Sequence, residues 1–242
     1  DVIEVAGTDT KLTASAVGDI HLSQTEGALS LDNVSSSQGN VALTAKESVL
    51  NGSATDVVNV VGNAIALSSE NGSIGTQTKA VKINTAFSDQ GQLTASAAND
   101  IYIEEVDGSM DIASMSIGAS AGLVADGDVL ASELTTLSGD LDVTSTNGNV
   151  IVATVAAGNN VTIDAAKDVN VGTLKAGNNV IVSSNANIQL NTLESGADAT
   201  MNAVENVQIV ELSTAGNTEL AAGNIELGQA VIQGAARINS AG

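Results

Sequence analysis

The chain of 242 residues contains no cysteine, no proline and no tryptophan. Phe87 and Tyr102 are its only aromatic residues, although 43% of all residues are hydrophobic. The absence of cysteine excludes disulfide bonds and thiolate metal sites. The scarcity of rings excludes an ordinary large core, in which each ring buries about 150–250 Å². The interior must therefore be filled by small aliphatic side chains.

Basic residues are also scarce, since 7 Lys and Arg stand against 28 Asp and Glu for a formal net charge of −21. Arg237 is the single arginine and the lysines are scattered, so no basic stripe is present for nucleic acid or anionic lipid. Apolar runs are short: the run at 57–61 is interrupted by Asn59, far below the ~20 residues of a membrane helix. We expect no nucleic-acid partner and no membrane insertion.

Apolar residues recur with a fixed 19-residue period in the second half of the chain. Residues 157–213 divide into three equal segments whose apolar positions align in columns. The columns are Val161, Val180, Ala199 and Thr218; Ile163, Val182, Met201 and Leu220; Val169, Ile188, Val207 and Ile225; Val171, Leu190, Ile209 and Leu227; and Leu174, Leu193, Leu212 and Val231. The third and fourth columns slip by one residue at the last step, and the fifth keeps its spacing throughout. Self-similarity at a short period is typical of a solenoid.

Within these columns apolar residues alternate with polar or small ones, as in Val161-Thr162-Ile163. Alternation with period two indicates short, half-buried strands. The segments between them are rich in Gly, Asn, Ala and Ser and too short for a covering helix. We therefore predict an all-β solenoid of roughly 12 rungs, with three short strands in each rung of about 19–20 residues, stacked ~4.8 Å apart.

Polar columns mark the corners of each rung. They are Asn160, Asn179, Asp198 and Asn217 before the first strand, and Asp168, Asn187, Asn206 and Asn224 before the second. Asn and Asp favour turns, and stacked amides form ladders in cross-β structures. Gly158, Gly177 and Gly196 lie just upstream, where we expect them to supply positive φ.

The first half of the chain follows the same plan less regularly. The sequence LTASA at 12–16 recurs at 93–97, an offset of 81 that predicts a separation of about four rungs. Irregular corners, from which side loops emerge, are expected at about 32–40, 51–61, 71–79 and 84–91.

The domain organisation is predicted to be simple. No proline-rich or Gly/Ser-only linker interrupts the pattern, so we expect a single β-solenoid segment over 1–242, with the more regular rungs in 139–238. Neither end resembles a cap, and solenoid ends need covering. The segment is expected to be part of a longer repeat protein.

The phrases GDIHL at 18–22, GNVAL at 39–43 and GNVIV at 148–152, together with NGSIGT at 71–76, resemble the filamentous haemagglutinin family of large bacterial exoproteins and adhesins. The resemblance covers nearly the whole chain. It implies a right-handed parallel β-helix, a secreted or cell-surface location, and a shaft or adhesive role. It also implies that a host or neighbouring-cell receptor or glycan is bound through other regions.

Catalytic machinery is not apparent in the sequence. Polysaccharide-acting β-helix enzymes need clustered carboxylates, or an Asp cluster with a catalytic Arg or Lys. Here the aspartates of the C-terminal half are spread over different columns, and Arg237 is near the end. We predict no catalytic residues, no cofactor and no enzymatic activity.

The densest acidic group is a candidate for weak calcium binding, because it offers oxygen ligands. Its members are Asp100, Glu104, Glu105 and Asp107. The alternative is a solvated corner. His21 and Tyr102 each lie between two apolar residues, so the alternation predicts that both face outward.

Two functions of different class follow. The first is the non-catalytic shaft of a secreted or cell-surface adhesin. The second is a self-assembling extracellular fibre, sheath or matrix subunit, in which copies associate end to end or laterally. A polysaccharide-acting enzyme is a remote alternative.

Overall fold

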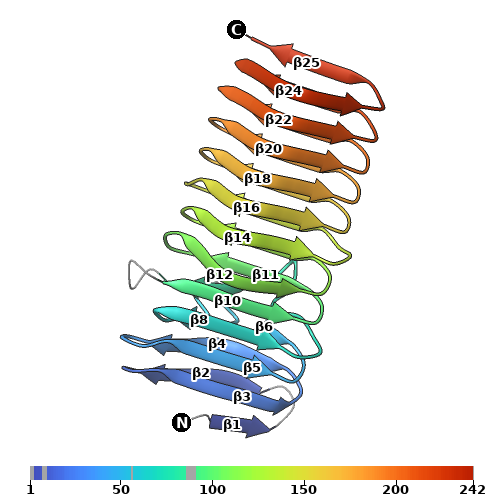
Figure 1. Ribbon diagram of the computed structural model, residues 1–242. Coiled ribbons are helices and arrows are strands. Elements are labelled where there is room, and N and C mark those ends of the chain that lie inside the picture. Colours follow the sequence, from blue (N-terminus) through green and yellow to red (C-terminus); the bar gives the residue numbers. More distant parts are fainter. Residues whose placement is uncertain (1–2, 7–9, 56, 86–90, 242) are drawn as a thin grey trace. The chain divides into compact units, whose positions relative to one another are not determined.

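The computed structural model describes residues 3–6, 10–55, 57–85 and 91–241 (Figure 1). Within these ranges the regular elements are all β-strands, and no helix is present that is long and apolar enough to cross a membrane. The chain divides into two compact units, an N-terminal unit (Asp1–Asp126) and a C-terminal unit (Gly127–Gly242). The expectation of one continuous segment over 1–242 stays a prediction.

The C-terminal unit contains two parallel sheets. Sheet A consists, in spatial order, of β14 (Val129–Thr136), β16 (Val150–Ala157), β18 (Val169–Ala176), β20 (Ile188–Ser195), β22 (Asn206–Thr214) and β24 (Asn224–Ile232). Sheet B consists of β15 (Leu141–Ser145), β17 (Val161–Ala165), β19 (Val180–Ser184), β21 (Ala199–Ala203), β23 (Thr218–Ala222) and β25 (Ala236–Ser240). The chain alternates between the sheets, so each strand pairs with the strand one coil away.

The N-terminal unit has the same arrangement. Its sheet A consists of β1 (Ile3–Ala6), β3 (Ile20–Glu26), β5 (Val41–Ala45), β8 (Ala64–Ser69), β10 (Gln92–Ala97) and β12 (Met110–Ile117). Its sheet B consists of β2 (Thr10–Ala16), β4 (Leu29–Ser36), β6 (Val49–Asn51), β7 (Val60–Val61), β9 (Val81–Asn84), β11 (Ile101–Glu105) and β13 (Ala121–Ala125). Both β6 and β7 pair with β4. Parallel crossovers of this kind are right-handed, and the predicted right-handed parallel β-helix is confirmed.

The predicted columns of the C-terminal unit are ladder partners. Val161 pairs with Val180, which pairs with Ala199 and then with Thr218. In sheet A, Val169 pairs with Ile188, which pairs with Val207, and the slip of one residue at Ile225 is also present. The 19-residue period is therefore the length of one coil.

Each coil holds two strands but three straight segments. In β18 the ladder skips Gly172, and the buried residues change from Val169 and Val171 to Leu174 and Ala176. An odd step in a period-two pattern means that the strand has turned to a new face. The same skip occurs in β16, β20 and β22. The predicted three short strands per rung are confirmed, with two of them continuous in one element.

The last coil corrects one column. Leu212 pairs with Ala230, not with Val231, because this coil is one residue shorter than the others. Val231 instead pairs with Ser213, whose side chain faces outward, and Val231 is itself 63% exposed. The prediction that this column keeps its 19-residue spacing was wrong at its final member.

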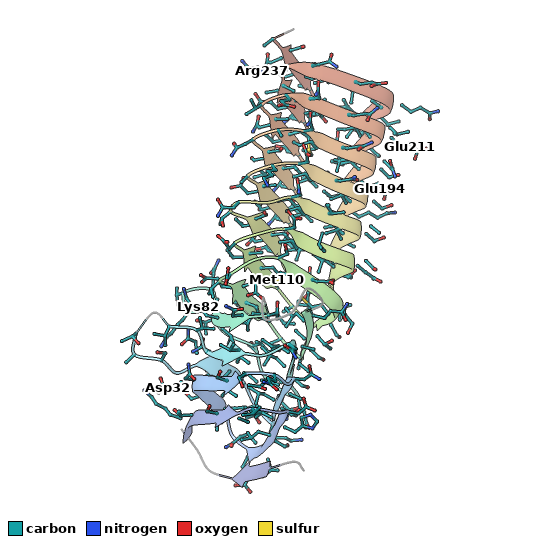
Figure 2. All side chains as sticks on the ribbon, turned by 90° about the vertical axis from the view of Figure 1, so that its left-hand side faces the viewer. Asp32, Lys82, Met110, Glu194, Glu211 and Arg237 are labelled. Carbon is teal, nitrogen blue, oxygen red and sulfur yellow. The ribbon has the colours of Figure 1, made fainter. Side chains whose placement is uncertain are left out.

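The core is aliphatic in both units. Among the described residues, the buried hydrophobic side chains are Val, Ile, Leu, Ala and Met, and Met110 is fully enclosed. Figure 2 shows the side chains of Glu194 and Glu211 projecting away from the coils. His21 is exposed and Tyr102 is half-buried on the outer face, as the alternation predicted. Phe87 lies outside the described residues.

The irregular corners fall mainly where the sequence placed them. Residues 52–59 separate β6 from β7, and residues 70–80 separate β8 from β9. The expected corner at 32–40 is wrong over its first part, because β4 continues to Ser36 and only the segment after it turns. Of the corner at 84–91, residues 86–90 lie outside the described residues.

The repeated LTASA sequences occupy different sheets. The copy at 12–16 is in β2 of sheet B, whereas the copy at 93–97 is in β10 of sheet A. The prediction that whole rungs separate them was therefore wrong. The copies share a local feature instead: after Leu12 and after Leu93, the pairing with the next strand shifts by one residue. In both cases the LTASA strand is regular, and its partner strand in the next coil contains one extra residue that bends it.

Candidate functional site

The corner columns form hydrogen-bonded ladders along the C-terminal unit. Asn160 Oδ1 accepts the backbone N–H of Asn179 at 3.1 Å, and Asn179 Oδ1 accepts that of Asp198 at 3.1 Å. Asp198 Oδ1 in turn accepts the N–H of Asn217 at 2.6 Å. Asp140 is the first acceptor of this column, because its Oδ1 accepts hydrogen bonds from the backbone N–H and the Nδ2 of Asn160. Each side chain thereby caps the corner of the next coil.

The second corner column has the same chemistry. Asp168 Oδ1 accepts from the backbone N–H of Asn187 at 3.1 Å and from its Nδ2 at 2.8 Å. Asn206 Nδ2 donates to Asn187 Oδ1 at 2.6 Å. At Asn224 the backbone N–H donates to Glu205 O at 2.9 Å. Asn and Asp are needed here because a short side-chain oxygen reaches the next coil.

The glycines upstream of the first column act by close approach, not by positive φ. In the described chain, the glycines with positive φ are Gly27, Gly75 and Gly108. At Gly177 a Cβ would collide with the carbonyl oxygen of Gly158, and at Gly196 with that of Gly177. The expectation of positive φ at these corners was wrong. Stacked backbones leave no room there for a side chain.

Buried hydroxyl groups complete the corners and were not anticipated from the sequence. Ser145 Oγ accepts the N–H of Gly148 at 2.9 Å and donates to Gly127 O at 2.7 Å. Ser36 and Ser69 accept equivalent bonds from Gly39 and Gly72. The available signal was a Ser or Thr three residues before a corner glycine, because such hydroxyls bond locally to turn backbone.

The predicted calcium candidates serve separate roles. Asp100 Oδ1 accepts the N–H of Ser120 at 3.0 Å, as a corner residue does. Glu104 forms an ion pair with Lys82 at 3.0 Å. Glu105 faces the opposite side of β11 and is buried, while Asp107 follows in the turn. Among the described residues, no three acidic or imidazole groups gather where they would hold a metal ion.

Glu105 is the least expected member of this group, because the alternative of a solvated corner does not fit it. Its carboxylate accepts the backbone N–H of Thr85 at 3.1 Å and the Thr85 hydroxyl at 2.7 Å. Burial raises the pKa of Glu105 to about 7, and the bonds from Thr85 offset this only in part. Glu105 thus occupies an inward position, and its ladder partner in the next coil is Ala125.

The irregular corners of the N-terminal unit line an open pocket of about 560 Å³, which Lys79, Lys82 and Glu104 also border. Lys79 Nζ donates to Ser53 O at 2.7 Å, which ties the two corners together. Asn59 is buried beneath them, where its Nδ2 donates to Leu31 O and its Oδ1 accepts the N–H of Lys82. These bonds satisfy backbone groups that the interrupted ladder leaves open.

A groove of about 380 Å³ lies on the outer side of sheet A in the C-terminal unit. One wall is the second corner column. The other wall is an outward column that runs in register through Asn170, Gln189, Gln208 and Glu226. Sequence reasoning missed this outward column, although its spacing follows that of the apolar columns beside it. No protein-family model, curated protein or solved structure was found to match the chain.

Proposed function

We propose that the chain is the non-catalytic shaft of a secreted or cell-surface bacterial adhesin or exoprotein of the filamentous haemagglutinin type. One observation carries the proposal. In each unit the successive coils are joined by parallel ladders around aliphatic columns, an arrangement that resists extension and bending along the stack. Receptor or glycan recognition that produces adhesion is assigned to other regions of the full-length protein.

The surface chemistry fits a spacer that stays exposed to water. The net charge of −21 keeps such a surface soluble and self-repelling. The ion pairs that do form join neighbouring coils, as Lys175 and Glu194 do at 3.0 Å. Exposed pairs of this kind contribute little stability, so the aliphatic columns and backbone ladders are the main source of rigidity.

The test uses the full-length protein in its native cells. Deleting residues 141–160 removes one coil in register, because Asp140 is then followed by Val161, the ladder partner of Leu141. Deleting 141–150 removes about half a coil and places inward residues on the wrong face. A shaft predicts that the first deletion preserves surface labelling by antibody and cell adhesion, whereas the second abolishes both.

Three results would contradict the proposal. Equal loss of adhesion from both deletions, with the in-register variant still displayed, would assign receptor binding to this region. Concentration-dependent, ordered polymerisation of the purified chain in sedimentation would favour the fibre or sheath subunit. Depolymerisation of a polysaccharide by the purified chain would identify an enzyme.

A further inference from the structure

The groove on the outer side of sheet A, in the C-terminal unit, has two walls with different hydrogen-bonding states. In the corner wall, the Nδ2 groups of Asn187 and Asn206 are used within the ladder. In the outward wall, the side chains of Asn170 and Gln189 are exposed and have no hydrogen-bond partner among the described residues. Each free amide offers two N–H donors and a carbonyl acceptor to a ligand.

The free amides are held in a repeating frame. Asn170 and Gln189 are ladder partners in β18 and β20, so their backbones lie one coil apart, at ~4.8 Å. Gln208 continues the row in β22 and donates from Nε2 to Glu226 Oε2 at 3.1 Å. A row of amides on rigid strands needs little reorganisation to bind an extended ligand that crosses several coils.

Charge and shape define the ligand class. No lysine or arginine lines the groove, and its charged side chains are the carboxylates of Asp168 and Glu226. Anionic polymers are therefore repelled. No aromatic ring is present for stacking. Amides and carboxylates do match hydroxyl groups, which donate to the carboxylates and exchange bonds with the amides.

We propose that this groove binds a segment of a neutral polysaccharide lying across the coils. Asn170 and Gln189 exchange hydrogen bonds with its hydroxyl groups, and the Asp168 and Glu226 carboxylates accept hydroxyl bonds at the two ends. Binding at a single groove is weak, because it lacks a buried apolar or aromatic anchor. The proposal is independent of the shaft function, since it rests only on the groove.

Affinity electrophoresis of the purified chain tests the proposal, with a soluble neutral glucan, mannan or galactan cast in the gel and polygalacturonate as the anionic counterpart. We expect retardation by at least one neutral polymer and none by polygalacturonate. The double variant Asn170→Ala/Gln189→Ala is expected to lose at least tenfold in association constant. The double variant Thr200→Ala/Asn202→Ala changes outward residues of sheet B and is expected to bind like the wild type.

A second variant guards against misfolding as the cause of lost binding. Asn170→Leu/Gln189→Met keeps side-chain size and charge but removes both the N–H donors and the carbonyl acceptors, so it too is expected to abolish retardation while circular dichroism is unchanged. The proposal is overturned if none of the neutral polymers retards the wild type, if polygalacturonate retards it equally, or if the groove and sheet B variants behave alike.

Discussion

The two units differ in how regularly their coils are spaced. In the C-terminal unit, Val150 pairs with Val169 and Val169 with Ile188, so these two successive coils have the same length. In the N-terminal unit, Ile65 pairs with Leu93 across a longer coil. The inward columns nevertheless continue through these longer coils. The stack therefore depends on inward residues meeting their partners, whereas the chain between them can vary in length.

The two units also differ in how their corners are stabilised. The C-terminal unit uses one repeated solution, an Asn or Asp that caps the next coil, as Asn179 does for Asp198. The N-terminal unit needs individual solutions where residues are inserted, such as Asn59 between Leu31 and Lys82. Regular coils thus share their stabilising contacts, and irregular coils depend on single residues.

The largest effect is expected where the two units agree, at the inward columns. Val180→Asp in the C-terminal unit and Ile103→Asp in the N-terminal unit each bury an unpaired carboxylate, which costs about 3–5 kcal/mol or more. Ile181→Asp is the matched control, because Ile181 neighbours Val180 but faces outward. Urea denaturation measures the loss. Equal destabilisation by Val180→Asp and Ile181→Asp would contradict the assigned faces.

A difference between the units is expected in their response to pH. Glu105 has a pKa of about 7 in the folded chain, against an ordinary value of 4.5. Between these values the folded state holds more protons, so stability falls as pH rises, by about 3 kcal/mol in total. The nearby Asp107 adds to the raised pKa, and Thr85 opposes it.

Glu105→Gln keeps the size of this side chain and removes its charge. We expect the variant to be more stable than the wild type above pH 7 and to approach it near pH 4.5. Comparing urea unfolding of the two proteins at pH 5 and pH 8 isolates Glu105 from the other carboxylates. A stability difference that does not change between these pH values would refute the buried charge.

Close backbone stacking is expected to make one glycine of the regular unit more sensitive than one of the irregular unit. Gly177→Ala places a Cβ against the carbonyl oxygen of Gly158, and such overpacking costs about 2–3 kcal/mol. At Gly18 a Cβ would meet no atom within 4 Å. Gly18→Ala is therefore expected to change the thermal midpoint little. Similar losses at both positions would show that stacking distance is not the cause.

The smallest predicted effect compares a buried asparagine with an exposed one. Asn59→Ala leaves the Lys82 N–H without its acceptor inside the N-terminal unit and is expected to cost about 2 kcal/mol. Asn187→Ala removes an exposed rung of the C-terminal ladder and is expected to cost less than about 1 kcal/mol. Local hydrogen exchange checks both. A larger loss of stability for Asn187→Ala than for Asn59→Ala would contradict this prediction and show that the ladder contributes more to stability than the buried asparagine.

The sequence predicted the features that repeat and missed those that occur once. Columns such as Val161 to Thr218 were readable because alternation and a 19-residue period coincide there. Val231 was misplaced because a coil shortened by one residue reverses inward and outward positions beyond it. The positions of the two LTASA copies were predicted wrongly because the sequence of a strand does not show to which sheet the strand belongs.

The polar positions were harder to predict for a physical reason. A glycine fits either a positive φ or a close backbone approach, and the sequence around Gly177 does not distinguish the two. Glu105 was counted with Glu104 as an exposed acid, although alternation puts neighbours on opposite faces. A buried glutamate opposes the usual rule for charge, so composition outweighed periodicity in that expectation.

The absence of cysteine makes a direct test of coil spacing possible, because introduced pairs have no background. Ladder partners at ~4.8 Å fall within the Cα separation of a disulfide, about 4.4–6.8 Å. Under mild oxidation, the pair Thr162→Cys/Ile181→Cys should form a disulfide in the C-terminal unit, and Ala42→Cys/Ala66→Cys should do so in the N-terminal unit despite its longer spacing in the sequence. The pair Ala42→Cys/Val61→Cys has the 19-residue spacing of a regular coil but lies on different sheets, so it should not form one. Crosslinking of the Ala42 and Val61 positions in preference to Ala42 and Ala66 would contradict the stacking of irregular coils on their inward columns.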